Sequence, residues 1–143
     1  LSEAIPDDYY TVAIGKARVV REGRALTVVT YGMGVLWAER TIAELGIDAE
    51  IIDLRTLLPL DYESIETSVR KTNKVIILHE DTLVGGIGRE IAAHVSEHLF
   101  EYLDAPVMRE ASLDTPIPFA SSLEKQFLPT GRFVEKVKKL MGY

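Results

Sequence analysis

The stretch Leu26-Thr27-Val28-Val29-Thr30-Tyr31 is short, rich in β-branched residues and nearly continuous in apolar character. Two later stretches share these properties: Ala49-Glu50-Ile51-Ile52-Asp53-Leu54 and Lys74-Val75-Ile76-Ile77-Leu78-His79. Runs of this kind are typical of parallel strands covered on both faces, because such strands have no solvent face that would need alternate polar residues. The sequence therefore predicts a buried parallel sheet built on these three strands.

Helical patterns separate and follow the predicted strands, at about residues 34–45, 61–71, 86–103 and 130–141. In the third pattern the apolar residues, Ile91 and Val95 among them, share one face and the glutamates share the opposite face, so this helix should lie on the sheet. Weaker strand signals occur at 17–21 and 106–110. The alternation of strands and helices predicts a three-layer α/β/α fold.

The last part of the chain is less regular. Residues 113–129 follow neither a helical nor a strand period and contain Pro116, Pro118 and Pro129, so we expect a long ordered loop there. The final helix is expected to begin with Thr130 as its N-cap, because a threonine hydroxyl can accept a hydrogen bond from a free amide of the first turn.

Length and composition fit one globular domain: the chain has 143 residues, of which 47% are hydrophobic and 27% are charged. Its net charge of −6 opposes binding to nucleic acids or anionic membranes. The absence of cysteine excludes disulfides and cysteine-ligated zinc, and a reducing compartment such as the cytosol is the default expectation. Residues 1–10 are expected to be a linker from an upstream domain, which leaves 11–143 as a single domain.

Titratable residues gather after the third strand, at the carboxyl edge where open α/β sheets bind ligands. His79-Glu80-Asp81 follows this strand, and Gly85 and Gly86 then open the next helix. A ligand or catalytic site would use such residues, but so would helix capping, loop bracing or contact with another domain. We interpret the cluster first as a structural loop or an interdomain contact.

Three weaker motifs have simpler explanations. Gly32-Met33-Gly34 follows a strand as a dinucleotide-binding turn would, but Trp37 stands in place of the third glycine, so we predict a tight turn and no dinucleotide. His94-Val95-Ser96-Glu97-His98 has the H-x-x-E-H spacing of a zinc-protease class, yet no further ligand is identifiable. Asp53 ends a strand like the phospho-acceptor of a receiver domain, but the paired acids that would hold magnesium are missing. The residues alone predict a soluble α/β domain without a self-sufficient active site.

Three segments go further when taken together. They are Val28–Met33 with Ile51–Asp61, His79-Glu80-Asp81 leading to Gly85–Ala93, and Asp114-Thr115-Pro116-Ile117-Pro118-Phe119 with Leu128-Pro129. The combination, which covers Tyr10 to Tyr143, resembles the C-terminal domain of the β-type E1 component of 2-oxo acid dehydrogenase complexes. Asp81 departs from the family pattern, because a small residue often holds that position. The third segment favours the branched-chain (2-oxoisovalerate) type over the pyruvate type.

This resemblance implies a mixed, mostly parallel five-stranded sheet whose first strand is antiparallel, as in transketolase C-terminal domains. It implies that thiamine diphosphate and magnesium are held by other domains of the parent enzyme, so that this domain carries no catalytic, cofactor-binding or metal-binding residue. The parent enzyme decarboxylates a 2-oxo acid and transfers the acyl group to the lipoyl arm of E2, in the bacterial cytoplasm or the mitochondrial matrix.

The resemblance also implies partners. The domain is expected to pack against the remaining E1 domains or the α subunit and against a two-fold related copy of itself, and to receive the small basic subunit-binding domain of E2. By this analogy Glu101, Asp104 and the carboxylate of Tyr143 are expected to supply acidic contacts to E2.

Two alternatives remain open at this point. A free-standing flavodoxin-like module would bind a nucleotide or a partner at the edge between His79 and Gly88. The equivalent domain of another thiamine-diphosphate enzyme, such as a synthase or a ferredoxin oxidoreductase, would also carry this sheet.

Overall fold

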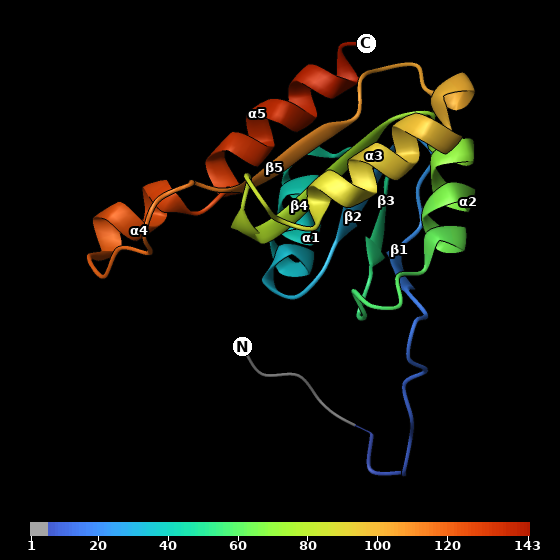
Figure 1. Cartoon of the computed structure of the whole chain (residues 1–143), viewed down its shortest axis with the longest axis horizontal. Coiled ribbons are helices and arrows are strands. Elements are labelled where there is room, and N and C mark those ends of the chain that lie inside the picture. The colour runs from blue at the N-terminus through green and yellow to red at the C-terminus, as the bar shows by residue number, and fades with distance from the viewer. Residues whose placement is uncertain (1–5) are drawn as a thin grey trace.

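Five strands form one mixed sheet in the order β1-β3-β2-β4-β5 in the computed structural model, which describes residues 6–143 (Figure 1). The strands β2, β3, β4 and β5 run parallel, and β1 pairs antiparallel with β3. Their bounds are β1 (Arg18–Arg21), β2 (Leu26–Thr30), β3 (Ala49–Asp53), β4 (Val75–Thr82) and β5 (Met108–Ser112). The predicted sheet, with its antiparallel first strand, is confirmed.

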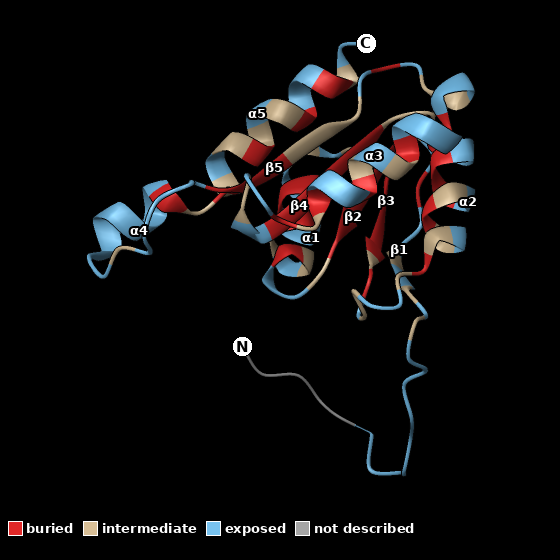
Figure 2. Ribbon diagram, viewed as in Figure 1, coloured by how far each residue is buried: buried red, intermediate tan, exposed pale blue. Residues whose placement is uncertain are grey.

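Helices cover both faces of the sheet, which gives the predicted three layers. The helices are α1 (Met33–Leu45), α2 (Tyr62–Thr72), α3 (Gly88–His98), α4 (Ser121–Phe127) and α5 (Thr130–Met141), with a 3₁₀ turn η1 (Phe100–Tyr102). One core joins α1 and α5 to the sheet, and a second core joins α2 and α3 to its other face. Figure 2 shows the buried residues concentrated on the strands between the two helical layers.

The central strand β2 explains why the apolar runs lack alternation. All five of its residues are buried, because a helix layer covers each face of the sheet. Two polar side chains of β2 are buried, Thr27 and Thr30. The hydroxyl of Thr27 is within hydrogen-bonding distance of two hydroxyls of α2, 2.7 Å from that of Ser68 and 2.6 Å from that of Thr72, so this polar atom is satisfied within the core.

Three predictions about the elements were wrong in detail. The third helix ends at His98 rather than 103, because Leu99 leaves the helical region with φ −128° and the chain continues as η1. Residues 113–129 are not all loop, since α4 occupies the proline-free part of that stretch. Thr130 is not the N-cap of α5 but its first residue; Pro129 precedes it, and no side chain caps the helix.

The predicted linker at 1–10 falls partly on residues 1–5, which lie outside the described residues. Residues 6–10 form no helix or strand and are exposed. Within the described part of the chain, no helix combines the length and the apolar character that crossing a membrane requires.

Candidate functional site

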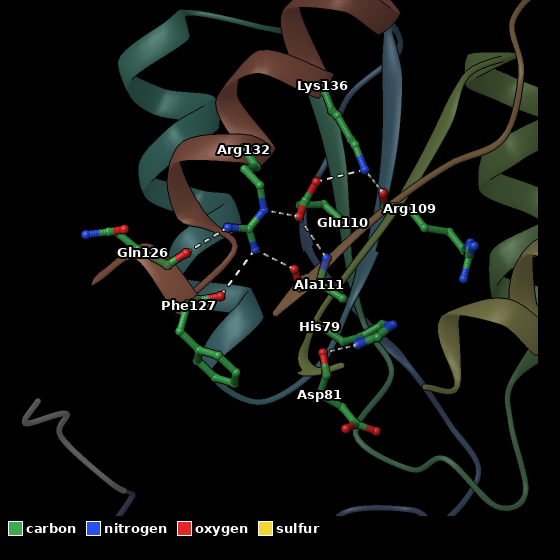
Figure 3. A network of polar contacts seen from close by, with 9 residues as sticks. All are labelled: His79, Asp81, Arg109, Glu110, Ala111, Gln126, Phe127, Arg132 and Lys136. Atoms are coloured by element: carbon green, nitrogen blue, oxygen red, sulfur yellow. Dashed lines mark hydrogen bonds and ion pairs between the residues drawn. The ribbon is translucent and has the colours of Figure 1, made fainter. Parts of the chain in front are cut away.

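The carboxyl edge of the sheet holds His79 in a fully buried position on β4. The strand continues to Thr82, so Glu80 and Asp81 lie on it rather than after it, and both are exposed. The Nδ1 atom of His79 lies 3.2 Å from the carbonyl oxygen of Asp81 (Figure 3). Burial lowers the pKa of His79, which keeps the ring neutral at pH 7. The neutral ring of His79 therefore has a structural role: it supports the loop that follows β4.

The glycines after β4 allow the close approach of the chain to this ring. A Cβ atom on Gly86 would lie 2.5 Å from Cε1 of His79, and one on Gly88 would lie 2.5 Å from its Nε2. Gly85 has a φ of +87°, a conformation that residues with a Cβ rarely adopt. Packing against His79 therefore requires Gly86 and Gly88, and the positive φ favours glycine at position 85, while contact of this loop with another domain stays a prediction.

A hollow of about 360 Å³ opens beside Glu80 and Asp81 at the same edge. We call it the carboxyl-edge hollow; it is lined by Tyr31, Glu80, Asp81, Thr82, Thr115, Ile117, Glu124, Phe127 and Leu128. Burial raises the pKa of Tyr31, and the negative charges of Asp81 and Glu80 raise it further. The hollow thus combines an apolar wall with a negative electrostatic potential.

A buried carboxylate on β5, which sequence analysis missed, fixes the wall of this hollow (Figure 3). Glu110 is 3% exposed; Arg132 Nε lies 2.9 Å from its Oε1 and Lys136 Nζ lies 2.8 Å from its Oε2. Arg132 also donates to the carbonyl oxygens of Gln126 and Phe127 at the end of α4, at 2.9 and 3.2 Å. The network therefore ties α4 and α5 to β5.

A second missed residue, Asp61, holds the edge next to β1. Its side chain accepts hydrogen bonds from the amide of Ser64, which caps α2, and from the amide of Ala17, which precedes β1. Burial by itself would raise the pKa of Asp61, but these hydrogen bonds hold it below its usual value. The sequence did contain a signal for the role of Asp61: it stands at the start of a helical pattern, and aspartate is a preferred N-cap.

The amino edge of the sheet carries the three residues predicted to contact E2. Asp104 and Tyr143 line one hollow of about 600 Å³, and Glu101 lies next to it on η1. All three residues are exposed. We call this the amino-edge hollow; Ser96, Phe100, Leu103, Ala105, Pro106 and Val107 complete its lining.

Two hydrogen bonds to Asn73 hold the loop that presents Asp104. The amide of Asp104 donates to the carbonyl oxygen of Asn73 at 2.9 Å, and the side-chain amide of Asn73 donates to the backbone carbonyl oxygen of Tyr102 at 2.7 Å. Phe100 beside it is 78% exposed. The arrangement offers a fixed acidic group beside an uncovered aromatic ring, a composition suited to binding a protein partner.

The three weaker motifs have local structural roles. The amide of Gly34 donates to the carbonyl of Tyr31 at 3.1 Å, so the glycine turn closes on itself before α1. His94 Nε2 lies 2.9 Å from Glu66 Oε1 on α2, which explains the first histidine of H-x-x-E-H. Asp53 accepts from the amide of Arg55 at 3.1 Å. Among residues 6–143, no three histidine or acidic side chains gather as a metal site would require.

Comparison with known proteins identifies the family of this chain. The model of the family "Transketolase, C-terminal domain" matches residues 15–134. This chain belongs to the transketolase C-terminal domain family. Two relatives of this transketolase C-terminal domain are the 2-oxoisovalerate dehydrogenase subunit beta of Pseudomonas aeruginosa, 51% identical over 81% of the chain, and the pyruvate dehydrogenase E1 component subunit beta of Staurastrum punctulatum, 41% identical over 98%.

The resemblance to E1 β chains is therefore confirmed, and its relatives include both the branched-chain and the pyruvate type. The chain spans 33% and 44% of the length of these two relatives. Among solved structures, a split gene transketolase described as an inactive beta4 tetramer superposes with a TM-score of 0.78 at 27% identity, over 97% of this transketolase C-terminal domain and 45% of the other chain.

Proposed function

We propose that this chain serves as the assembly and E2-docking domain of a thiamine-diphosphate-dependent 2-oxo acid dehydrogenase E1 of the branched-chain type. The parent enzyme decarboxylates a branched-chain 2-oxo acid and passes the acyl group to lipoyl-E2, in the bacterial cytoplasm or the mitochondrial matrix. The 51% identity to a 2-oxoisovalerate dehydrogenase subunit supports the branched-chain type. The amino-edge hollow carries the docking part of the proposal.

The amino-edge hollow has the chemistry that a small basic domain would recognise. Asp104 stands at its wall and Glu101 on the adjacent turn, and both carboxylates are exposed. The rings of Phe100 and Tyr143 offer apolar area beside them, 78% and 58% exposed. Acidic groups around an aromatic contact orient a basic partner and raise its rate of association. The net charge of −6 acts in the same direction.

The residues of this chain do not fit thiamine diphosphate or its magnesium. No cluster of three carboxylates or histidines occurs in the described range 6–143. At the start of α1, the amides of Gly34 and Val35 donate to the carbonyls of Tyr31 and Gly32 and are not free for a phosphate. We therefore assign the cofactor and the chemistry to neighbouring domains of the parent E1, together with the α subunit and a two-fold related copy.

Isothermal titration tests the docking site. The probe is the isolated subunit-binding domain of the E2 from the same organism, titrated into the parent E1. Glu101→Lys and Asp104→Lys should each weaken binding at least about tenfold, because charge reversal replaces attraction by repulsion at the interface. Glu39→Lys makes the same charge change on α1, outside both hollows, and should leave the affinity unchanged. Equal affinities for all variants would refute the docking site.

A further inference from the structure

The loops at the carboxyl edge expose large apolar side chains that the fold itself does not cover. They come from the segment before β1 and from the loops after β3, β4 and β5, which the topology brings to one edge. Among them are Ile14, Leu58, Val84, Ile117 and Phe119, between 65% and 106% of full exposure. Uncovered apolar groups gathered on one side of a domain indicate a contact surface.

The carboxyl-edge hollow lies within this surface and combines an apolar wall with an acidic rim. Phe127, Leu128 and Ile117 form its apolar part, and Glu80, Asp81 and Glu124 contribute three carboxylates. Among its lining residues, all of which are described, there is no lysine, arginine or histidine. The hollow therefore offers negative charge to an occupant that brings its own positive charge.

The wall of the hollow is rigidly connected to the sheet. The amide of Leu113 donates to the carbonyl of Phe127 at 3.2 Å, and Arg132 binds the same carbonyl. On the opposite side, the amide of Val84 donates to the carboxylate of Asp114 at 2.8 Å, which joins the loop after β4 to the loop after β5. The shape is thus formed before any partner binds, which reduces the entropic cost of binding.

We infer that the carboxyl-edge hollow receives a segment of another domain of the parent enzyme that presents an apolar side chain next to a lysine or arginine. The apolar side chain fills the space between Ile117 and Phe127, and the cation lies between Glu80 and Glu124. This inference deepens the proposed function and rests on the place of the chain in a larger E1.

A second copy of this edge does not fit the same hollow. A two-fold axis passing through the hollow would place it opposite its own copy, so Glu80, Asp81 and Glu124 would face the same three carboxylates. Like charges opposed at an interface suppress association. We therefore expect the occupant to come from a surface other than this edge.

Photo-crosslinking in the parent E1 identifies the occupant. With p-benzoylphenylalanine in place of Ile117, irradiation should join this domain to a segment outside it, and mass spectrometry should find a lysine or arginine within a few residues of the linked position. Crosslinks confined to a second copy of the same edge would overturn the inference, as would the absence of any crosslink to another domain or subunit.

Charge reversal tests the acidic rim in the same experiment. Glu80→Lys with Glu124→Lys should lower the crosslink yield at least about fivefold, because the cation of the occupant is then repelled. The control, Glu39→Lys, should leave the yield unchanged, and an equal yield in all variants would contradict the role of the rim. E2 affinity, measured on the same proteins, should not change, since E2 docks at the amino edge. Unchanged E2 affinity in Glu101→Lys and Asp104→Lys, together with an intact crosslink from position 117, would therefore refute the proposed docking and leave this inference standing.

Discussion

Arg132 on α5 donates from Nε to Oε1 of Glu110 on β5 across 2.9 Å, although Glu110 is almost completely buried. The two hydrogen bonds that the same guanidinium makes to the end of α4 place a seven-residue helix that is too short to be stable alone. The side chain of Arg132 thus links the wall of the carboxyl-edge hollow to the buried carboxylate of β5.

Arg132→Met should lower the free energy of unfolding by about 2–3 kcal/mol, because Glu110 then keeps only Lys136 as its cation and three backbone carbonyls lose a donor. Urea denaturation followed by circular dichroism measures the change. Lys138→Met on the same helix removes an exposed pair with Glu135 and should change stability by less than about 0.5 kcal/mol. Similar losses for both variants would contradict the importance of the buried pair.

Gly88→Ala should destabilise the domain by about 1–3 kcal/mol, since its Cβ would lie 2.5 Å from the buried ring of His79. Gly131→Ala is the matched control, because that glycine lies in α5 with open space around it. The control should stabilise the helix by up to about 1 kcal/mol. Thermal unfolding of both variants distinguishes the effects, and a neutral Gly88→Ala would show that the loop is not packed on His79.

The acid sensitivity of the fold should depend in part on Asp61. Its folded-state pKa lies below the usual value, so the ionised group adds stability at neutral pH, and this contribution is lost as the pH falls below about 4. Asp61→Asn should therefore flatten the acid limb of a plot of unfolding free energy against pH. If the variant loses stability between pH 5 and pH 3 as steeply as the parent protein (both limits approximate), the hydrogen bonds to Asp61 are not responsible.

His79 should contribute a separate slope nearer neutrality. Its pKa is lowered in the folded state, so the unfolded chain binds the proton more readily and stability decreases as the pH falls below about 6.5. His79→Gln should remove this slope, whereas His98→Gln, at the exposed end of α3, should retain it. Urea denaturation at a series of pH values is the measurement, and an unchanged slope in His79→Gln would exclude the buried ring as its source.

The sheet could be predicted from the sequence because β2, β3 and β4 are buried on both faces, and this burial leaves an apolar run that any chain of this kind must show. The short helix α4 could not, since its position depends on Arg132 and on burial of Phe127 rather than on a local period. The pair between Arg132 and Glu110 is likewise a tertiary contact, set by how α5 lies on β5.

The candidate sites, too, could be predicted only in part. Asp104 and Tyr143 were proposed together from family resemblance, and the fold brings them to one hollow although 39 positions (143 minus 104) separate them. The meeting of Glu80 with Glu124 could not be predicted, because nothing in the loop after β5 indicates that it folds back toward the end of β4. Sequence patterns predict where buried helices and strands lie, whereas the contacts between exposed loops depend on the complete fold.

We propose that this domain docks E2 and leaves the chemistry to its neighbours. Two activities of the parent E1 carrying Asp104→Lys test this division: decarboxylation with an artificial electron acceptor, and the overall reaction of the complex reconstituted with limiting E2. The first activity should be unchanged, and the second should fall at least about fivefold as E2 binding weakens. A loss of decarboxylation itself, or full activity in the reconstituted complex, would show that Asp104 does not serve E2 docking.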